Sequence, residues 1–146
     1  MPGMNNSGHA FDSYKSTQIQ TANQGQLIIM LYEGAIRFLG QSKEMIAEKK
    51  LDKAHNFIMK AQDIVTELMT SLDLEKGGKI AENLLSIYIY VNKRLVEANI
   101  KKDPAIIDEA AKIFNDLLIS WRQVVDTPAP AASGNPKHRG GINIAG

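Results

Sequence analysis

The side chains that most often bind metals or act as catalysts are few and scattered in this sequence. Cysteine is absent, which excludes disulfides, thiolate metal sites and thiol nucleophiles. The histidines His9, His55 and His138 lie far apart, and His55 has no carboxylate at ligand spacing on an apolar face, so we expect it to face solvent. Gly77-Gly78 lacks the preceding strand and third glycine of a phosphate-binding loop. The sequence therefore predicts no catalytic residues, no metal site and no cofactor, and favours a protein that is not an enzyme.

Binding through apolar surfaces is the chemistry that remains, and the apolar residues recur at helical spacing. In four segments they return every three or four positions, which is typical of helices packed nearly parallel in a bundle. These seams are Leu27, Leu31, Gly34, Phe38 and Met45; Ala54, Ile58, Ala61, Val65, Leu68 and Leu72; Ile80, Leu84, Ile87, Val91, Leu95 and Ala98; and Ile106, Ala110, Ile113, Leu117, Trp121 and Val124.

Three of the four segments carry a second apolar set beside the seam. Its members are Ile28, Ala35, Leu39 and Ile46; Leu85, Tyr88, Ile89 and Val96; and Ile107, Ala111, Phe114, Leu118 and Val125. One interpretation is a wide core with Tyr and Met side chains at its rim. The other is a groove that receives an amphipathic segment of a partner protein. Periodicity alone favours the wide core.

Helix boundaries can also be predicted. Asp103-Pro104 opens the fourth helix with an N-cap and a proline at the first helical position. The first helix has Thr21 or Asn23 as its cap, Glu48-Lys49-Lys50 forms the turn after it, and Gly77-Gly78 separates the second helix from the third. Four helices of about 20 residues with short connections pack as antiparallel neighbours. We therefore predict an all-α fold, an antiparallel up-down four-helix bundle.

Composition divides the 146 residues into three parts: a polar, flexible segment 1–22, the bundle 23–125 and a tail 126–146. The tail is rich in Pro, Gly, Ala and Ser, so we expect it to be disordered and inert. Seventeen basic against sixteen acidic residues give a net charge of +1, which disfavours nucleic acid as a partner. The longest apolar run, 27–32, is too short to insert into a membrane, and a cytoplasmic location is the default expectation.

Several fragments of the bundle segment, taken in order, resemble the flagellar export chaperone family FliS. They are Tyr14; Thr21-Ala22-Asn23; Gln26 to Phe38, with the sequence QLIIMLYEGAIRF; Lys60 to Ile64; Glu67 to Asp73; Ile80 to Leu84; Tyr88 to Leu95, followed by Ala98-Asn99; Asp103; and the helix with Trp121. The resemblance covers about residues 11–125 with the loops in register. It departs at Asn23-Gln24-Gly25, where the family often has a small residue, a proline and an acidic residue, and in the long tail.

The resemblance implies a four-helix bundle with a short N-terminal cap segment and a function in the cytosol. Proteins of this family bind the disordered C-terminal segment of flagellin, prevent its premature polymerisation and help to deliver it to the membrane protein of the flagellar type III export gate. This favours the groove interpretation of the wide apolar faces. The expected flagellin-binding residues are Tyr14, Ile58, Val65, Leu85, Ile89, Val96, Ile107 and Leu118.

Two other functions remain as alternatives at this point. One is a generic helical adaptor bundle that binds a different amphipathic helix. The other is a metal-carrying or enzymatic bundle, which needs inward carboxylates and histidines that the seams lack. A flagellar regulatory protein is a further candidate partner, and we expect the free protein to be a monomer or a weak homodimer.

Overall fold

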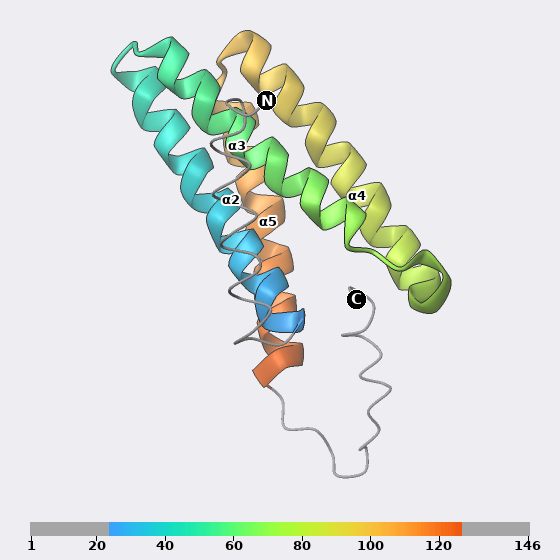
Figure 1. The fold of residues 1–146 in the computed structure, drawn as a ribbon. Helices are drawn as coiled ribbons and strands as arrows, with labels where there is room; N and C mark the ends of the chain where they lie inside the picture. Colours follow the sequence, from blue (N-terminus) through green and yellow to red (C-terminus); the bar gives the residue numbers. More distant parts are fainter. Residues whose placement is uncertain (1–23, 127–146) are drawn as a thin grey trace, which may run out of the picture.

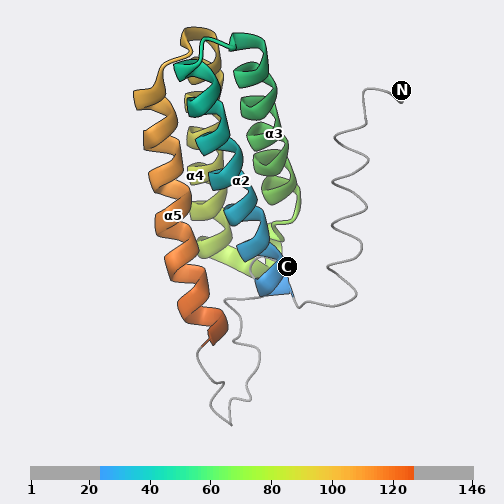
Figure 2. The same cartoon turned by 90° about the vertical axis from the view of Figure 1, so that its left-hand side faces the viewer.

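A computed structural model describes residues 24–126, which form four helices and no strand. The helices are α2 (Gln24–Ala47), α3 (Leu51–Thr70), α4 (Leu74–Lys101) and α5 (Pro104–Asp126). Consecutive helices run in opposite directions, as Figure 1 and Figure 2 show. Helix α2 packs against α3 and α5, and α4 packs against the same two helices. The predicted all-α four-helix bundle is confirmed, whereas the N-terminal segment and the tail lie outside the described residues.

The connections between helices follow local sequence signals. The backbone turns back after α2 at Lys49, which has a φ of 62°. Asp73 caps α4 because its Oδ1 accepts hydrogen bonds from the amides of Glu75 (3.2 Å) and Lys76 (3.0 Å). Asp103 caps α5 in the same way, and its Oδ1 lies 2.9 Å from the amide nitrogen of Ala105. The predicted opening of this helix at Asp103-Pro104 is therefore confirmed.

A kink interrupts the first turns of α4 at Gly78. Its φ of 55° and ψ of −136° lie in a region that residues with a Cβ rarely adopt. The short turn at 74–77 is thereby set at an angle to the rest of α4. The predicted chain break at Gly77-Gly78 falls here, within α4 rather than before it.

The core is apolar apart from a few groups at its centre. The hydroxyls of Tyr32 on α2 and Tyr88 on α4 are buried and lie 2.7 Å apart in a hydrogen bond. The ring of Phe114 on α5 is tilted against Tyr32, with centroids 6.1 Å apart. The two hydroxyls therefore join helices that lie diagonally across the bundle, and the buried Phe114 ring packs beside Tyr32.

Candidate functional site

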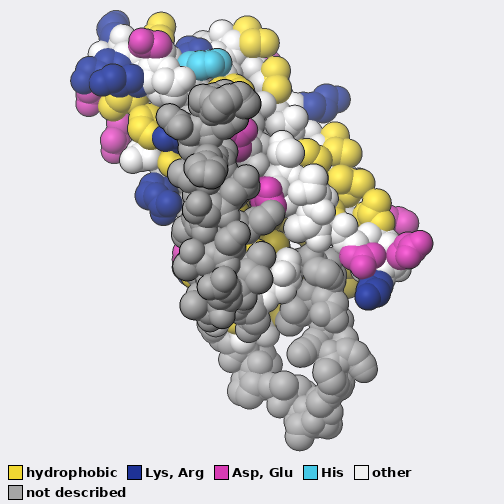
Figure 3. Space-filling view, in the orientation of Figure 1, with side chains coloured by type: hydrophobic (Ala, Val, Ile, Leu, Met, Phe, Trp, Pro, Cys, Tyr) yellow, Lys and Arg dark blue, Asp and Glu magenta, His cyan; other side chains and the backbone are white. Residues whose placement is uncertain are grey.

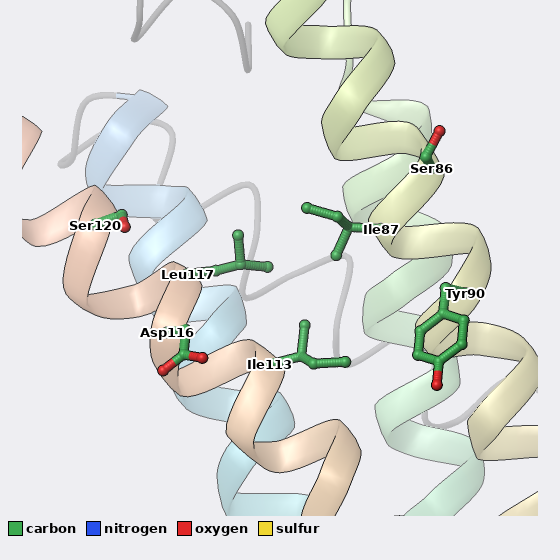
Figure 4. A pocket seen from close by; sticks show the side chains of 7 residues that line it. All are labelled: Ser86, Ile87, Tyr90, Ile113, Asp116, Leu117 and Ser120. Atoms are coloured by element: carbon green, nitrogen blue, oxygen red, sulfur yellow. The ribbon is translucent and has the colours of Figure 1, made fainter.

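A shallow apolar groove lies on the surface where α4 and α5 meet. It encloses about 480 Å³ and is lined by Ser86, Ile87, Tyr90, Ile113, Asp116, Leu117 and Ser120. In Figure 4 the side chains of Ile87, Ile113 and Leu117 point toward one another from the two helices. All three side chains are partly buried and pack against the core. The floor of this α4/α5 groove is therefore apolar, and the core supports it.

Ionic and hydrogen-bonded contacts hold the α4/α5 groove at the end near Tyr90. The Tyr90 hydroxyl donates to the Glu109 carboxylate, and the Arg94 guanidinium bridges Glu109 (2.9 Å) and Glu97 (2.6 Å). The hydrogen bond from Tyr90, followed by the one from Arg94, lowers the pKa of Glu109. The same hydrogen bond to a carboxylate raises the pKa of Tyr90. Glu109 is therefore charged at neutral pH, and this end of the groove is fixed to both helices.

An apolar row that is largely exposed follows the outer face of α4. We call it the α4 stripe, and its members at helical spacing are Leu85, Ile89, Val96 and Ile100. Figure 3 shows hydrophobic side chains gathered along α4. Ile89 is 48% exposed, Val96 is 43% exposed and Ile100 is 77% exposed, so their contacts within the chain leave much of them in water. Apolar surface arranged in one row on a helix is typical of an interaction site.

The residues expected to bind flagellin are divided between surface and core. Leu85, Ile89 and Val96 lie on the α4 stripe. Ile58, Val65, Ile107 and Leu118 are instead buried in the core, where they hold the helices together and do not reach the surface. Tyr14 lies outside the described residues. The structure therefore brings three of the eight expected residues together on one accessible surface.

Sequence reasoning assigned the floor of the groove to the core. The predicted seams included Ile87, Ile113 and Leu117, which line the groove, while the second set included Phe114 and Leu118, which are buried. The two sets on α5 are adjacent, so a small rotation of the helix exchanges their roles. The width of the apolar face was a valid signal for a groove, but it did not indicate which half faces solvent.

The described residues contain neither a cluster of metal-binding side chains nor a membrane-spanning helix. Within residues 24–126, no three His, Asp or Glu side chains lie close enough to hold a metal ion together. None of the four described helices is long and apolar enough to cross a membrane. His55 is exposed as predicted, and its Nδ1 lies within hydrogen-bonding distance of the Asn99 side chain on α4.

Comparison with known proteins identifies the family. The family model described as flagellar protein FliS matches residues 5–128. The chain belongs to the FliS family. The flagellar secretion chaperone FliS of Bacillus subtilis is 27% identical over 117 residues, which cover 80% of this chain and 86% of that protein.

Two further FliS relatives have higher identity. The flagellar secretion chaperone FliS of Campylobacter jejuni is 32% identical over 79% of this chain and 90% of its own length. The flagellar secretion chaperone FliSB of Pseudomonas aeruginosa is 33% identical over 71% of this chain and 82% of its own length. Membership of the FliS family gives this chain a chaperone role in flagellar export, and implies a secreted flagellar protein as its substrate.

Proposed function

We propose that this FliS-family chaperone binds the C-terminal segment of flagellin in the cytosol. The segment occupies the α4/α5 groove and continues along the α4 stripe, which prevents premature polymerisation and keeps flagellin ready for delivery to the membrane protein of the export gate. The observation that carries the proposal is that α4 presents two apolar surfaces, the α4/α5 groove and the exposed α4 stripe. The family's role in export supports a flagellar substrate for this surface.

The size of the surface fits a ligand that folds as it binds. Ordering a disordered segment costs about 2–5 kcal/mol. Burying apolar surface returns about 25 cal/mol for each Å², so roughly 80–200 Å² is needed to offset this cost before any net affinity appears. Side chains such as Ile89 and Val96 are already about half buried and supply only part of this area each. The flagellin segment must therefore cover several such side chains, which requires an extended interface.

The test is a pair of matched substitutions on exposed isoleucines. Ile89 on the α4 stripe is 48% exposed, and Ile119, which does not line the groove, is 49% exposed. A glutamate at position 89 places a charge in the apolar interface, so Ile89→Glu should weaken binding of a flagellin C-terminal peptide roughly tenfold or more. Isothermal titration calorimetry measures the dissociation constant, and circular dichroism confirms that both variants are folded.

The control separates the surface from general effects of charge. Ile119→Glu adds the same charge at the same exposure and should change the dissociation constant by less than about twofold. Equal affinities of the two variants would place flagellin elsewhere on the bundle. A folded wild-type protein that does not bind the peptide at all would favour a generic helical adaptor with a different amphipathic helix as its ligand.

Three expectations accompany this proposal. Tyr14 is proposed to contact the bound flagellin segment with its ring while its hydroxyl stays in water. A flagellar regulatory protein is proposed as an additional partner. The free chaperone is proposed to be a monomer or a weak homodimer.

A further inference from the structure

We propose that the α4/α5 groove is occupied in the free protein by the end of the chain's own tail, Ile142-Asn143-Ile144. The occupant is thus a named segment of this chain, which begins sixteen residues after the end of α5 at Asp126. The docking rests on the groove and on the sequence of the tail. The effect of the docked tail on flagellin binding rests in addition on the proposed function.

The tail starts close to the groove and is long enough to return to it. Leu117, on the groove floor, lies nine residues before Asp126, which is about 14 Å along helix α5. The 16 residues from Asp126 to Ile142 can span up to about 53 Å when extended. The connection can therefore reverse direction and reach the groove without stretching.

The apolar residues of the tail match the floor of the groove. Beyond Asp126, Ile142 and Ile144 are the only large apolar side chains in the sequence. In an extended backbone, residues two apart point to the same side, so both isoleucines face one surface. The groove offers three converging apolar side chains to meet them: Ile87, Ile113 and Leu117 (Figure 4).

Charge favours the same pairing. The tail contains the basic run Lys137-His138-Arg139 just before its isoleucines, and it has no acidic residue after Asp126. The groove lining includes Asp116, and the exposed Glu82 lies one helical turn before Ser86 on α4. Asp116 is paired with Lys112 at 3.2 Å, but both side chains are mostly exposed, so this ion pair is weak and can exchange.

A tethered ligand has a high local concentration. For a short flexible linker this is about millimolar, so even a weak contact between tail and groove is populated. Flagellin must displace the tail to enter the groove, and its apparent dissociation constant is raised by the fraction of molecules that are closed. If about four-fifths of the molecules are closed, binding is about fivefold weaker than for an open groove. The tail thereby makes the chaperone selective for ligands that use the α4 stripe as well.

The experiment compares methyl NMR spectra of the full-length protein and two tail variants, without flagellin. Ile142→Asp/Ile144→Asp removes the apolar contacts, and Ala131→Asp/Ala132→Asp adds the same charge elsewhere in the tail. We expect the methyl signals of Ile87, Ile113 and Leu117 to shift in the first variant only. The signals of the core residue Ile58 on α3 should stay unchanged in both. The wild-type protein should show nuclear Overhauser contacts between the tail isoleucines and the groove.

Each other result overturns the proposal. Groove signals that are the same in all three proteins mean that the tail does not dock there, and equal shifts in both variants mean that charge rather than apolar contact is responsible. Shifts that disappear on about tenfold dilution place the tail in a second copy of the chain instead.

A titration with the flagellin peptide separates this proposal from the proposed function. If the tail docks and flagellin uses the groove, Ile142→Asp/Ile144→Asp should bind the peptide about fivefold more tightly than the wild type. If the groove signals shift but the affinity for the peptide is unchanged, the tail docks in the groove and flagellin binds elsewhere. Unshifted groove signals with normal binding of the peptide would overturn the docked tail and leave the proposed function intact.

Discussion

The hydroxyls of Tyr32 and Tyr88 are polar groups in an apolar core, so each depends on the other. Their hydrogen bond is 2.7 Å long, and both side chains are almost completely buried. A buried hydroxyl that loses its partner costs about 1–3 kcal/mol, whereas replacing both partners with apolar groups of the same shape is nearly neutral. The pair therefore fixes how α2 and α4 meet more than it adds net stability.

A double-mutant cycle in urea tests this coupling. Tyr32→Phe leaves the buried Tyr88 hydroxyl without its partner, so it should lower the free energy of unfolding by about 1–3 kcal/mol. Tyr88→Phe should lower it by a similar amount, because it leaves the buried Tyr32 hydroxyl without its partner. The double variant should lose clearly less than the sum of the two single losses. Additive losses would show that the hydroxyls act independently.

The same tyrosines predict a loss of stability at alkaline pH. Burial, followed by the charge of Tyr88 and the hydrogen bond to it, raises the pKa of Tyr32, and burial also raises the pKa of Tyr88 to about 12. In the unfolded chain a tyrosine ionises near pH 10. From about pH 10 to about pH 12 the unfolded state therefore loses protons that the folded state retains, and the free energy of unfolding falls as pH rises.

Tyr32→Phe/Tyr88→Phe should reduce this alkaline loss. Each buried tyrosine contributes a slope of at most about 1.4 kcal/mol per pH unit. Urea unfolding of both proteins at about pH 9 and about pH 11 gives the loss of unfolding free energy of each protein between these pH values. Groups that titrate alike in both proteins cancel when the two losses are subtracted. The wild-type protein should lose more stability between these pH values than the variant, and parallel losses would contradict the assignment.

At the scale of the helix, two glycines of α2 form a matched pair. A Cβ at Gly40 meets nothing within 4 Å, so Gly40→Ala should raise the free energy of unfolding by about 0.5–1 kcal/mol through helix propensity. A Cβ at Gly34 lies 3.2 Å from Cδ1 of Ile64, because α2 and α3 approach closely there. Gly34→Ala should therefore gain less than Gly40→Ala, since Ile64 must shift. Thermal unfolding of the two variants checks this, and an equal gain would mean that Ile64 moves freely.

The positions of the helices along the chain can be predicted from the sequence better than the rotation of each helix about its own axis. The caps at Asp73 and Asp103 are hydrogen bonds from nearby amides to the aspartate side chains, so a few residues determine them. The positive φ of Lys49, in contrast, is a conformation that residues other than glycine rarely adopt. Ile113 and Leu117 line the groove while Phe114 and Leu118 are buried, and a single helix contains no information that separates these two pairs. Which of the two pairs faces the groove depends on how α5 packs against both α2 and α4.

Over the whole molecule, charges hold helices together and apolar surface is left for a partner. Ion pairs link α2 to α5 through Lys43 and Asp108 (2.6 Å) and through Arg122 and Glu33, and Arg94 links α4 to Glu109 on α5. A net charge of +1 gives no strong long-range field to attract an oppositely charged ligand. Recognition of the proposed flagellin segment therefore depends on burial of apolar surface.

This balance predicts how the affinity responds to salts. Sodium chloride screens exposed charges, but the α4 stripe is apolar and has no charge to screen. The affinity for the flagellin peptide should therefore fall less than about threefold between low and high concentrations of this salt. Sodium sulfate is excluded from protein surfaces and strengthens apolar burial, so it should tighten binding at equal ionic strength. Calorimetric titrations with the flagellin C-terminal peptide in the two salts measure both effects, with Ile119→Glu as the control for added surface charge. A large loss of affinity in sodium chloride would instead place the main contacts at charged residues such as Asp116, and would assign the apolar groove a secondary role.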